Sequence, residues 1–384
     1  MTAESITLRV AESINEIDPH DWNRLTDPND PFTDHAFLAL LEESGSVGPR
    51  TGWIPVHLLA HRGTQLVGAM PLYLKDNSYG EYIFDWGWAQ AAQRAGIPYY
   101  PKLVSAVPFT PATGRRLLAL DSDVEQTLLD GLHGVAKATR ALSIHILFCS
   151  EPESTAGKAR PELIGRTTHQ FHWNNTGYTS FDDWLSTFRS RRRKEVRRER
   201  AAPAKLGVEV EVIRGRDLTE QHWQSMRGFY ERTIQKKHAQ AYLTEEFFSL
   251  APHRLSHSAL LFFATHDGEP VAGSLCFQRG NHLMGRYWGC LPAYESLHFE
   301  LCYHAPIELC IRHQWSHFEA GAQGLHKVQR GLAPARTHSL HHLRHPGLHE
   351  AVRDALAHED AQVEAELKWC ETKLPFHRTD RTTG

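Results

Sequence analysis

The sequence has no long hydrophobic run, no paired cysteines and no excess of one charge. No segment approaches the roughly 18 uncharged apolar residues that a membrane-spanning helix needs, so we expect no such helix. The N-terminal residues show no basic segment followed by an apolar stretch, and we therefore expect a cytoplasmic protein. The 42 basic and 45 acidic residues give a formal charge of −3, which argues against a protein that coats nucleic acid or a membrane with its whole surface. Any anion-binding site must therefore be local.

Several catalytic and metal-binding motifs are also missing. The six cysteines include no Cys-x-x-Cys pair, so we expect reduced, structural thiols. The absence of Gly-x-Ser-x-Gly and Gly-x-Gly-x-x-Gly motifs argues against an α/β-hydrolase and a dinucleotide-binding protein. The 26 histidines are abundant enough to fall at ligand spacing by chance. Strand alternation separates His338, His341, His342 and His345 onto opposite faces, and no His-Glu-x-x-His motif occurs, so we expect no metal site.

Length and composition favour two globular domains. The chain of 384 residues is longer than one ordinary core requires, and hydrophobic residues make up 41% of it. This hydrophobic share is typical of globular proteins and sufficient for proper cores. We predict an N-terminal domain over residues 1–170 and a C-terminal domain over residues 171–384.

An internal repeat supports two similar halves. Residues 57–74 and 262–279 align without a gap. The aligned identities are His61 with His266, Gly63 with Gly268, and Gly68 with Gly273. Each copy reads as an apolar strand, a glycine-containing turn and a second apolar strand, and the same offset aligns Tyr82 with Tyr287 in an aromatic third strand. A chance similarity between two hairpins is the alternative.

Helix and strand patterns surround each copy of this antiparallel meander. Before the two copies we predict helices at 20–25, 34–44, 219–236 and 244–250. After the first copy we predict a strand at 102–107, a helix at 124–139 and a strand at 141–149. After the second copy we predict a helix at 296–314, strands at 317–320 and 337–343, and a closing helix at 347–374. The predicted fold class is α/β (α+β), with two halves that each hold a mixed, mainly antiparallel sheet flanked by helices.

A strongly basic segment lies between the halves. Ser180, followed by two aspartates, is a suitable N-cap for a helix over about 180–206. Between residues 189 and 200 eight side chains are basic and two are acidic, so like charges repel along this helix. One interpretation is a phosphate-binding surface for coenzyme A, a tRNA acceptor arm or an anionic precursor. Its residues would be Arg192, Arg193, Lys194 and Arg197, together with Arg286 from the second meander. The alternative is a solvated helix whose arginines pair with acidic residues.

The richest polar region follows the second meander. Glu319 ends a short apolar strand before a glycine-containing turn, where a carboxylate can act as general base toward an amine. Lys327 and Arg330 follow closely and supply positive charge for an oxyanion or a phosphate. We therefore predict Glu319, Lys327, Arg330 and Tyr287 as catalytic residues. The alternative is a network of salt bridges without a catalytic role.

A second polar group lies on the helix predicted after the second meander. Glu300, His304, Glu308 and Arg312 follow one another at i,i+4 spacing and form one charged stripe. The stripe either stabilises the helix surface or lines a cleft that orients an amine nucleophile. In the second case Glu300 and His304, together with His326, bind the acceptor.

Three segments, residues 79–86, 100–115 and 318–327, resemble the FemAB-like proteins of the GNAT acyltransferase superfamily. The resemblance extends over nearly the whole chain. It implies two tandem GNAT-like halves, an amide-forming transfer and a link to peptidoglycan precursors. Two departures restrict what it implies. The GNAT pyrophosphate loop is only partly present at 286–291. The run at 324–332 is similar to the Fem motif Gly-Leu-Tyr-Lys-Phe-Lys-x-Gly-Phe, but Gln329 replaces the second lysine of that motif.

These features predict an enzyme that transfers an activated acyl or aminoacyl group to an amine on a small molecule or peptide precursor. The donor would be an aminoacyl-tRNA or an acyl-CoA, and we expect no tightly bound cofactor. A conventional acyl-CoA-dependent GNAT N-acetyltransferase is the first alternative, and it would bind coenzyme A measurably. The second alternative is a non-catalytic protein that binds a cell-wall precursor or tRNA through the basic helix. The sequence leaves open the identities of donor and acceptor and the oligomeric state.

Overall fold

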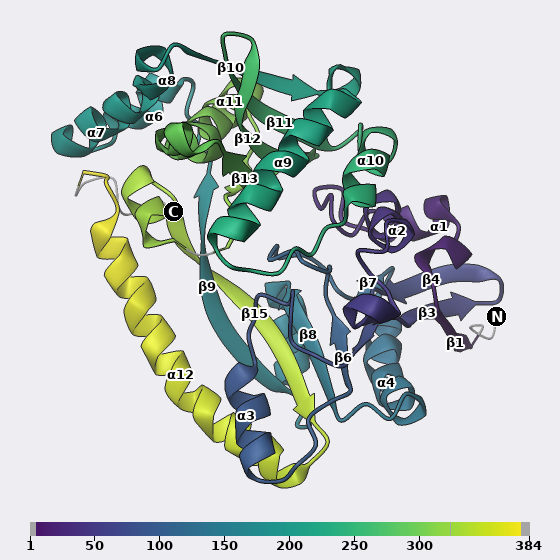
Figure 1. Ribbon diagram of the computed structural model, residues 1–384. Helices are drawn as coiled ribbons and strands as arrows, with labels where there is room; N and C mark the ends of the chain where they lie inside the picture. Colours follow the sequence, from purple (N-terminus) through teal and green to yellow (C-terminus); the bar gives the residue numbers. More distant parts are fainter. Residues whose placement is uncertain (1–4, 323, 378–384) are drawn as a thin grey trace. The chain divides into compact units, whose positions relative to one another are not determined.

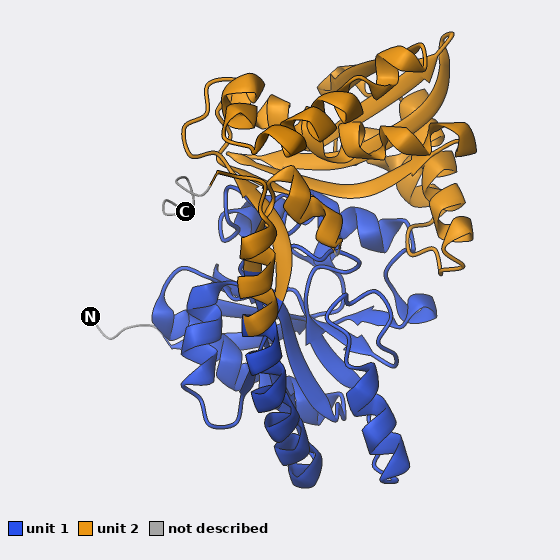
Figure 2. Cartoon of the chain, turned by 90° about the vertical axis from the view of Figure 1, so that its left-hand side faces the viewer, with its two compact units in different colours: residues 1–168, 336–364 blue, residues 169–335, 365–384 orange. Residues whose placement is uncertain are grey.

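The computed structural model describes residues 5–322 and 324–377 of the chain, which form two compact units. Unit 1 contains Met1–Thr168 and Arg336–Glu364, and unit 2 contains His169–Ala335 and Ala365–Gly384 (Figure 2). The chain therefore returns to unit 1 after unit 2, whereas a division at residue 170 gives two continuous segments. Within the described ranges, no helix has the length and apolar character required to cross a membrane.

One sheet of unit 1 is four-stranded and antiparallel (Figure 1). Its strands, in spatial order, are β1 (Ile6–Ala11), β3 (His57–Arg62), β4 (Gln65–Met70) and β7 (Leu118–Ala119). Helix α4 (Ser122–Ala138) packs on this sheet through its buried leucine and valine side chains. Asp121 caps the helix by accepting a hydrogen bond from the backbone N–H of Val124. The predicted hairpin at 57–74 and the predicted helix at 124–139 are thus confirmed.

The other strands of unit 1 pair in the order β15, β8, β6, β5, β2. Their bounds are β15 (Ala333–Leu343), β8 (Ser143–Cys149), β6 (Lys102–Ser105), β5 (Tyr73–Lys75) and β2 (Trp53–Pro55). Further helices of this unit are α1 (Pro19–Asn23), α2 (His35–Glu43), α3 (Trp86–Arg94) and α5 (Glu151–Lys158). The prediction of an aromatic strand through Tyr82 is wrong, because residues 76–85 form a loop whose polar side chains turn into the core.

The sheet of unit 2 has the strand order β10, β11, β12, β13, β14, β9. The bounds are β10 (Val208–Arg214), β11 (Ala259–His266), β12 (Glu269–Arg279), β13 (His282–Cys290), β14 (His317–Glu319) and β9 (Ile164–Asn174). Strands β13 and β14 run parallel, and the neighbouring pairs are antiparallel. The second hairpin of the repeat and its aromatic third strand are thus confirmed. Each unit has the predicted mixed, mainly antiparallel sheet flanked by helices.

Helix α9 (Glu220–Lys236) covers the β12 and β13 region of this sheet. The two elements approach closely at Gly289, where an added Cβ would lie 2.0 Å from the backbone oxygen of Phe229. Only glycine leaves room for this approach. Other helices of unit 2 are α10 (Glu245–Arg254) and α11 (Ala305–His313), and the chain closes with α12 (Pro346–Lys373), as predicted.

The basic segment does not form one continuous helix. It is divided into α6 (Phe181–Ser186), α7 (Ser190–Arg200) and α8 (Ala202–Lys205). Ser180 caps α6 as predicted, and its hydroxyl accepts a hydrogen bond from the N–H of Asp183. The helix is interrupted between α6 and α7 because Phe188 is fully buried and forms a β-bridge with Phe376. The helix predicted at 296–314 likewise begins with a 3-10 turn and a π-helical turn before α11.

Candidate functional site

Strand β13 is the structural centre of the candidate site in unit 2. Its parallel pairing with β14 extends only from His282 to Met284, so the two strands are not paired beyond that point. On its other side the register with β12 shifts, and Arg286 is the extra residue of a β-bulge. A bulge bends a strand and changes the direction of its side chains. Residues 285–288 consequently line a pocket.

This pocket has a volume of about 970 Å³. Its walls come from the end of α9, from β13, from residues 292–303 and from Ala320, Ala322, Gly324, His326 and Lys327. Its lining includes five basic side chains, Arg232, Lys236, Lys237, Arg286 and Lys327, and one acidic side chain, Glu295. Lys236 forms an ion pair with Glu295. The remaining positive charge makes the pocket suitable for an anionic ligand.

Lys327 is the buried cation of the pocket wall. It lies in a 3-10 turn (Leu325–Arg330), and only 2% of the residue is exposed. Its Nζ donates hydrogen bonds to the backbone oxygens of Gly321 at 2.5 Å and Ala322 at 3.3 Å. Burial lowers the pKa of Lys327 to about 8. An amine with this pKa can stabilise an oxyanion or transfer a proton near neutral pH.

Neutral aromatic and polar groups form another part of the lining. The hydroxyl of Tyr303 lies 2.8 Å from Nε2 of His326. Burial lowers the pKa of His298 to about 4, so its imidazole is uncharged near pH 7. Burial also raises the pKa of the Cys302 thiol to about 12, which argues against a thiolate nucleophile here. Tyr287 packs edge-to-face on Tyr230, with ring centroids 5.4 Å apart.

The structure separates the predicted site residues into two groups. Lys327, Tyr287, Arg286 and His326 all line the pocket. The remaining predicted residues lie on α7, on the helix turns that contact it, or at the end of β14, and they are not part of this lining. Sequence reasoning missed the cations of α9, because basic residues at the end of a helix are common without any ligand.

Arg330, His304 and Glu300 belong to an ion-pair network with α7. Arg330 donates to Glu199 through Nη2 at 2.6 Å, and Nε2 of His304 lies 2.7 Å from the same carboxylate. Glu300 is 3.4 Å from Arg200, and burial raises its pKa to about 7. These contacts support the interpretation of the charged stripe as a packed helix surface.

The basic residues of α7 face solvent to different degrees. Lys194 and Arg197 are exposed, whereas Arg192 and Arg193 are half-buried. Arg192 pairs with Glu195, and Arg193 donates to the backbone oxygen of Ser186 at 3.0 Å. Buried Val196 anchors the helix in the core of unit 2. The helix therefore presents a positive surface, although its acidic residues neutralise part of the charge.

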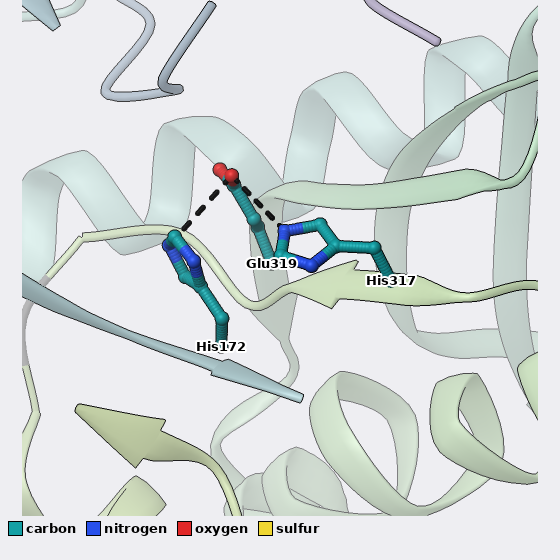
Figure 3. Close-up of side chains that lie close together, drawn as sticks. All are labelled: His172, His317 and Glu319. Atoms are coloured by element: carbon teal, nitrogen blue, oxygen red, sulfur yellow. Dashed lines mark hydrogen bonds and ion pairs between the residues drawn. The ribbon is translucent and has the colours of Figure 1, made fainter. Parts of the chain in front are cut away.

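Glu319 lies between two imidazoles at the end of β14 (Figure 3). Its Oε1 is 3.3 Å from Nε2 of His317 and 3.6 Å from Nε2 of His172. Burial would raise the pKa of this carboxyl group, but the neighbouring histidines outweigh burial and hold the pKa below its usual value. The carboxylate is therefore engaged by histidines rather than presented in the pocket lining.

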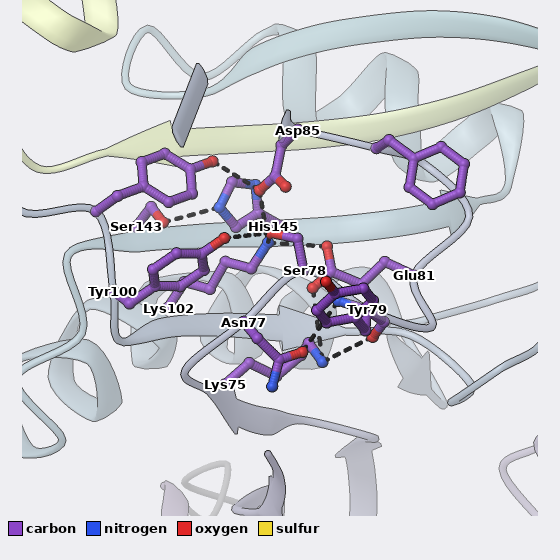
Figure 4. A network of polar contacts seen from close by, with 12 residues as sticks. Lys75, Asn77, Ser78, Tyr79, Glu81, Asp85, Tyr100, Lys102, Ser143 and His145 are labelled. Atoms are coloured by element: carbon purple, nitrogen blue, oxygen red, sulfur yellow. Dashed lines mark hydrogen bonds and ion pairs between the residues drawn. The ribbon is translucent and has the colours of Figure 1, made fainter. Parts of the chain in front are cut away.

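Unit 1 contains a buried polar network that sequence reasoning did not identify (Figure 4). Nζ of Lys102 donates to Asp85 at 2.5 Å and to Glu81 at 2.9 Å. Lys75 lies 3.7 Å from Glu81, and its Nζ is 3.6 Å from the ring centroid of Trp53. Burial lowers the pKa of Lys75 and raises that of Glu81, each to about 7.

All four charged side chains of this network are nearly inaccessible to solvent. Glu81, Asp85 and Lys102 lie in the segments that carry the resemblance to FemAB-like proteins. In this chain the two segments are therefore tied together inside unit 1. We assign the network a structural role, because water and ligands do not reach it.

The family comparison covers almost the whole chain. A model of the FemAB-like family, described as peptidoglycan biosynthesis and recognition, matches residues 13–378. No curated protein matches.

Solved structures with a similar fold include FemX, with a TM-score of 0.55, 12% identity, and coverage of 90% of this chain and 100% of FemX. The C-terminal domain of a protein described as a lysylphosphatidylglycerol synthetase from Agrobacterium fabrum has a TM-score of 0.53 and 10% identity. That alignment covers 89% of this chain and 96% of the domain. At such low identity these structures support the fold alone.

Proposed function

The chain belongs to the FemAB-like family, and on that basis we propose that it transfers an activated acyl or aminoacyl group to an amine in the unit 2 pocket. The observation that carries the proposal is buried Lys327, with its lowered pKa, in the wall of a positively charged pocket beside the bulge of β13. The fold is similar to that of FemX, and this similarity concerns the fold alone.

The transfer requires the acceptor nitrogen to attack the carbonyl carbon of an ester or thioester. A C–N bond forms, and the bond from the carbonyl carbon to the leaving oxygen or sulfur then breaks. Between these two events, negative charge develops on the carbonyl oxygen. The ammonium of Lys327 is placed to donate a hydrogen bond to that oxygen. With a pKa of about 8, it can also give a proton to the leaving group and regain one from the acceptor.

Lys327 can supply the positive charge that is missing from this chain where Gln329 replaces the lysine of the Fem motif. Gln329, which replaces the lysine of that motif, is exposed, whereas Lys327 is buried in the pocket wall. We therefore assign the catalytic charge to Lys327. Arg286, Arg232 and Lys237 would hold phosphates of the donor. Glu319 was predicted as general base, and its contacts with histidines favour a different role, considered below.

The basic surface of α7 favours aminoacyl-tRNA over acyl-CoA as donor. If α7 binds tRNA phosphates, the affinity for tRNA of any sequence should fall when glutamine replaces Arg192, Arg193, Lys194 and Arg197. The slope of log affinity against log salt falls by up to about 3 to 4, since each phosphate contact contributes about 0.7 to 0.9. Filter binding at several salt concentrations measures both quantities.

A matched control removes four exposed basic residues from unit 1, namely Arg9, Arg50, Arg94 and Lys137. This control changes net charge equally and should leave the salt slope nearly unaltered. Equal slopes for the wild type and the α7 variant would exclude α7 as the tRNA-binding surface.

Thermal stabilisation distinguishes the donors, because a ligand that binds the native state raises its apparent stability. Aminoacyl-tRNA should raise the melting temperature more than coenzyme A does at the same ligand concentration. Stabilisation by coenzyme A or acetyl-CoA alone would instead favour the conventional acyl-CoA-dependent N-acetyltransferase. Stabilisation by tRNA without any transfer would favour the non-catalytic binder.

A further inference from the structure

Three adjacent strands of unit 2 place histidine and carboxylate side chains on one face. On β14, His317 and Glu319 are two residues apart and therefore point the same way. Across the antiparallel pairing with β9, His172 lies opposite Glu319. On the other side, His282 of β13 lies opposite His317. Phe318, between the two polar residues of β14, belongs to the hydrophobic core.

The spacing of these groups suits a metal ion. One potential ligand atom from each of His172, His317 and Glu319 lies within 4.8 Å of the others. Oε1 of Glu319 is 3.3 Å from Nε2 of His317 and 3.6 Å from Nε2 of His172. In a tetrahedral zinc site with bonds of about 2.0 to 2.1 Å, ligand atoms lie about 3.3 to 3.4 Å apart. Two of the three separations are therefore close to the required values.

A second contact orients His317 for coordination. Its Nδ1 lies 2.7 Å from the side-chain oxygen of Asn174, which directly faces it on β9. Because an amide oxygen only accepts hydrogen bonds, this Nδ1 carries the proton. In the neutral ring, Nε2 then has a free lone pair that faces a carboxylate oxygen at 3.3 Å. A bound metal ion would lie between these two atoms, and a protein oxygen that accepts a hydrogen bond from the other ring N–H is common around zinc-bound histidines.

We propose that His172, His317 and Glu319 bind one zinc ion, with a water molecule or His282 as fourth ligand. The ring centroid of His282 is 4.8 Å from that of His317, so a side-chain rotation can bring it into the site. The three ligands are at most 17% exposed as side chains, which limits exchange of the ion with solvent. Glu319 directly precedes the loop whose carbonyl groups accept the hydrogen bonds of Lys327. The ion would therefore fix the end of β14 beneath the pocket.

The purified full-length chain, stripped with a chelator and then dialysed against buffered micromolar zinc, tests the proposal through metal content. We expect about one zinc per chain for the wild type by elemental analysis. Glu319→Gln, which keeps the shape of the side chain, and His172→Ala should each bind less than a tenth of that amount. Asn174→Ala should weaken affinity by about 10- to 100-fold. His253→Ala, at a well-exposed histidine, is the matched control and should bind zinc like the wild type.

Cobalt gives a second, spectroscopic readout of the same site. A tetrahedral site in the wild type should give visible absorption on titration with Co²⁺, and Glu319→Gln should abolish it. No zinc and no cobalt signal in the wild type would overturn the proposal. Equal metal content in the wild type, Glu319→Gln and His172→Ala would also overturn it. Neither outcome depends on transfer activity, so the zinc site and the proposed function fail separately.

Discussion

Replacing Lys327 by methionine is expected to lower kcat/KM of acyl transfer by about 100- to 1,000-fold, the usual cost of losing an oxyanion donor. Methionine fills most of the volume but cannot donate a hydrogen bond, so the carbonyl oxygens of Gly321 and Ala322 lose their partner as well. Steady-state kinetics measure the loss, and circular dichroism establishes that the variant is folded. The exposed neighbour provides the control, since Gln329→Met should keep wild-type kinetics.

The pH profile separates a catalytic charge from a structural one. If the ammonium form of Lys327 is active, the rate of the wild type falls as pH rises through about 8, because the amine then loses its proton. Lys327→Arg keeps its charge throughout this range, so any residual activity of that variant should lack the alkaline decline. An unchanged profile and full turnover in Lys327→Met would exclude Lys327 from the reaction.

The second large effect concerns stability and is expected at Lys102 in unit 1. Lys102→Met leaves Asp85 buried without its paired lysine and Glu81 with the more distant Lys75, and breaking a buried ion pair in this way costs about 3 to 5 kcal/mol. Urea unfolding should therefore show unit 1 losing stability by about this amount.

Lys137→Met is the matched control, because Lys137 is exposed and its replacement should change stability by less than about 0.5 kcal/mol. A loss below about 1 kcal/mol for Lys102→Met would show that Glu81 and Asp85 find other partners or become protonated. The network would then not hold the loop at 76–85 in place.

The hairpins and helices that are determined by residues close together in the sequence were predicted correctly. Both hairpins of the repeat, α4 and α12 follow from alternation or helical spacing. The basic segment is interrupted because Phe188 packs against Phe376, a contact with the far end of the chain that no local pattern contains. The loop through Tyr82 replaced a predicted strand for the same reason, since its polar side chains pair with Lys102 on β6.

The site shows the same division between local and long-range information. Arg286 was predicted from the second meander and Lys327 from the polar segment after Glu319, and both line the pocket. The i,i+4 spacing of Glu300 and His304 correctly gave a shared helix face, but spacing does not reveal that this face packs on α7. The candidate zinc ligands were missed, because His172 becomes the neighbour of Glu319 only through pairing of β9 with β14.

The most direct test of the account is transfer of a radiolabelled amino acid from charged tRNA to an amine of a peptidoglycan precursor. We expect the wild type to form a labelled product that survives mild base, which hydrolyses the ester of unreacted donor but not an amide. Lys327→Met should form at most about 1% of this product in the same time, in line with the loss of an oxyanion donor. Equal product from the wild type and Lys327→Met would contradict the assignment of the reaction to the unit 2 pocket. No product with either charged tRNA or acetyl-CoA as donor would contradict the proposed function itself.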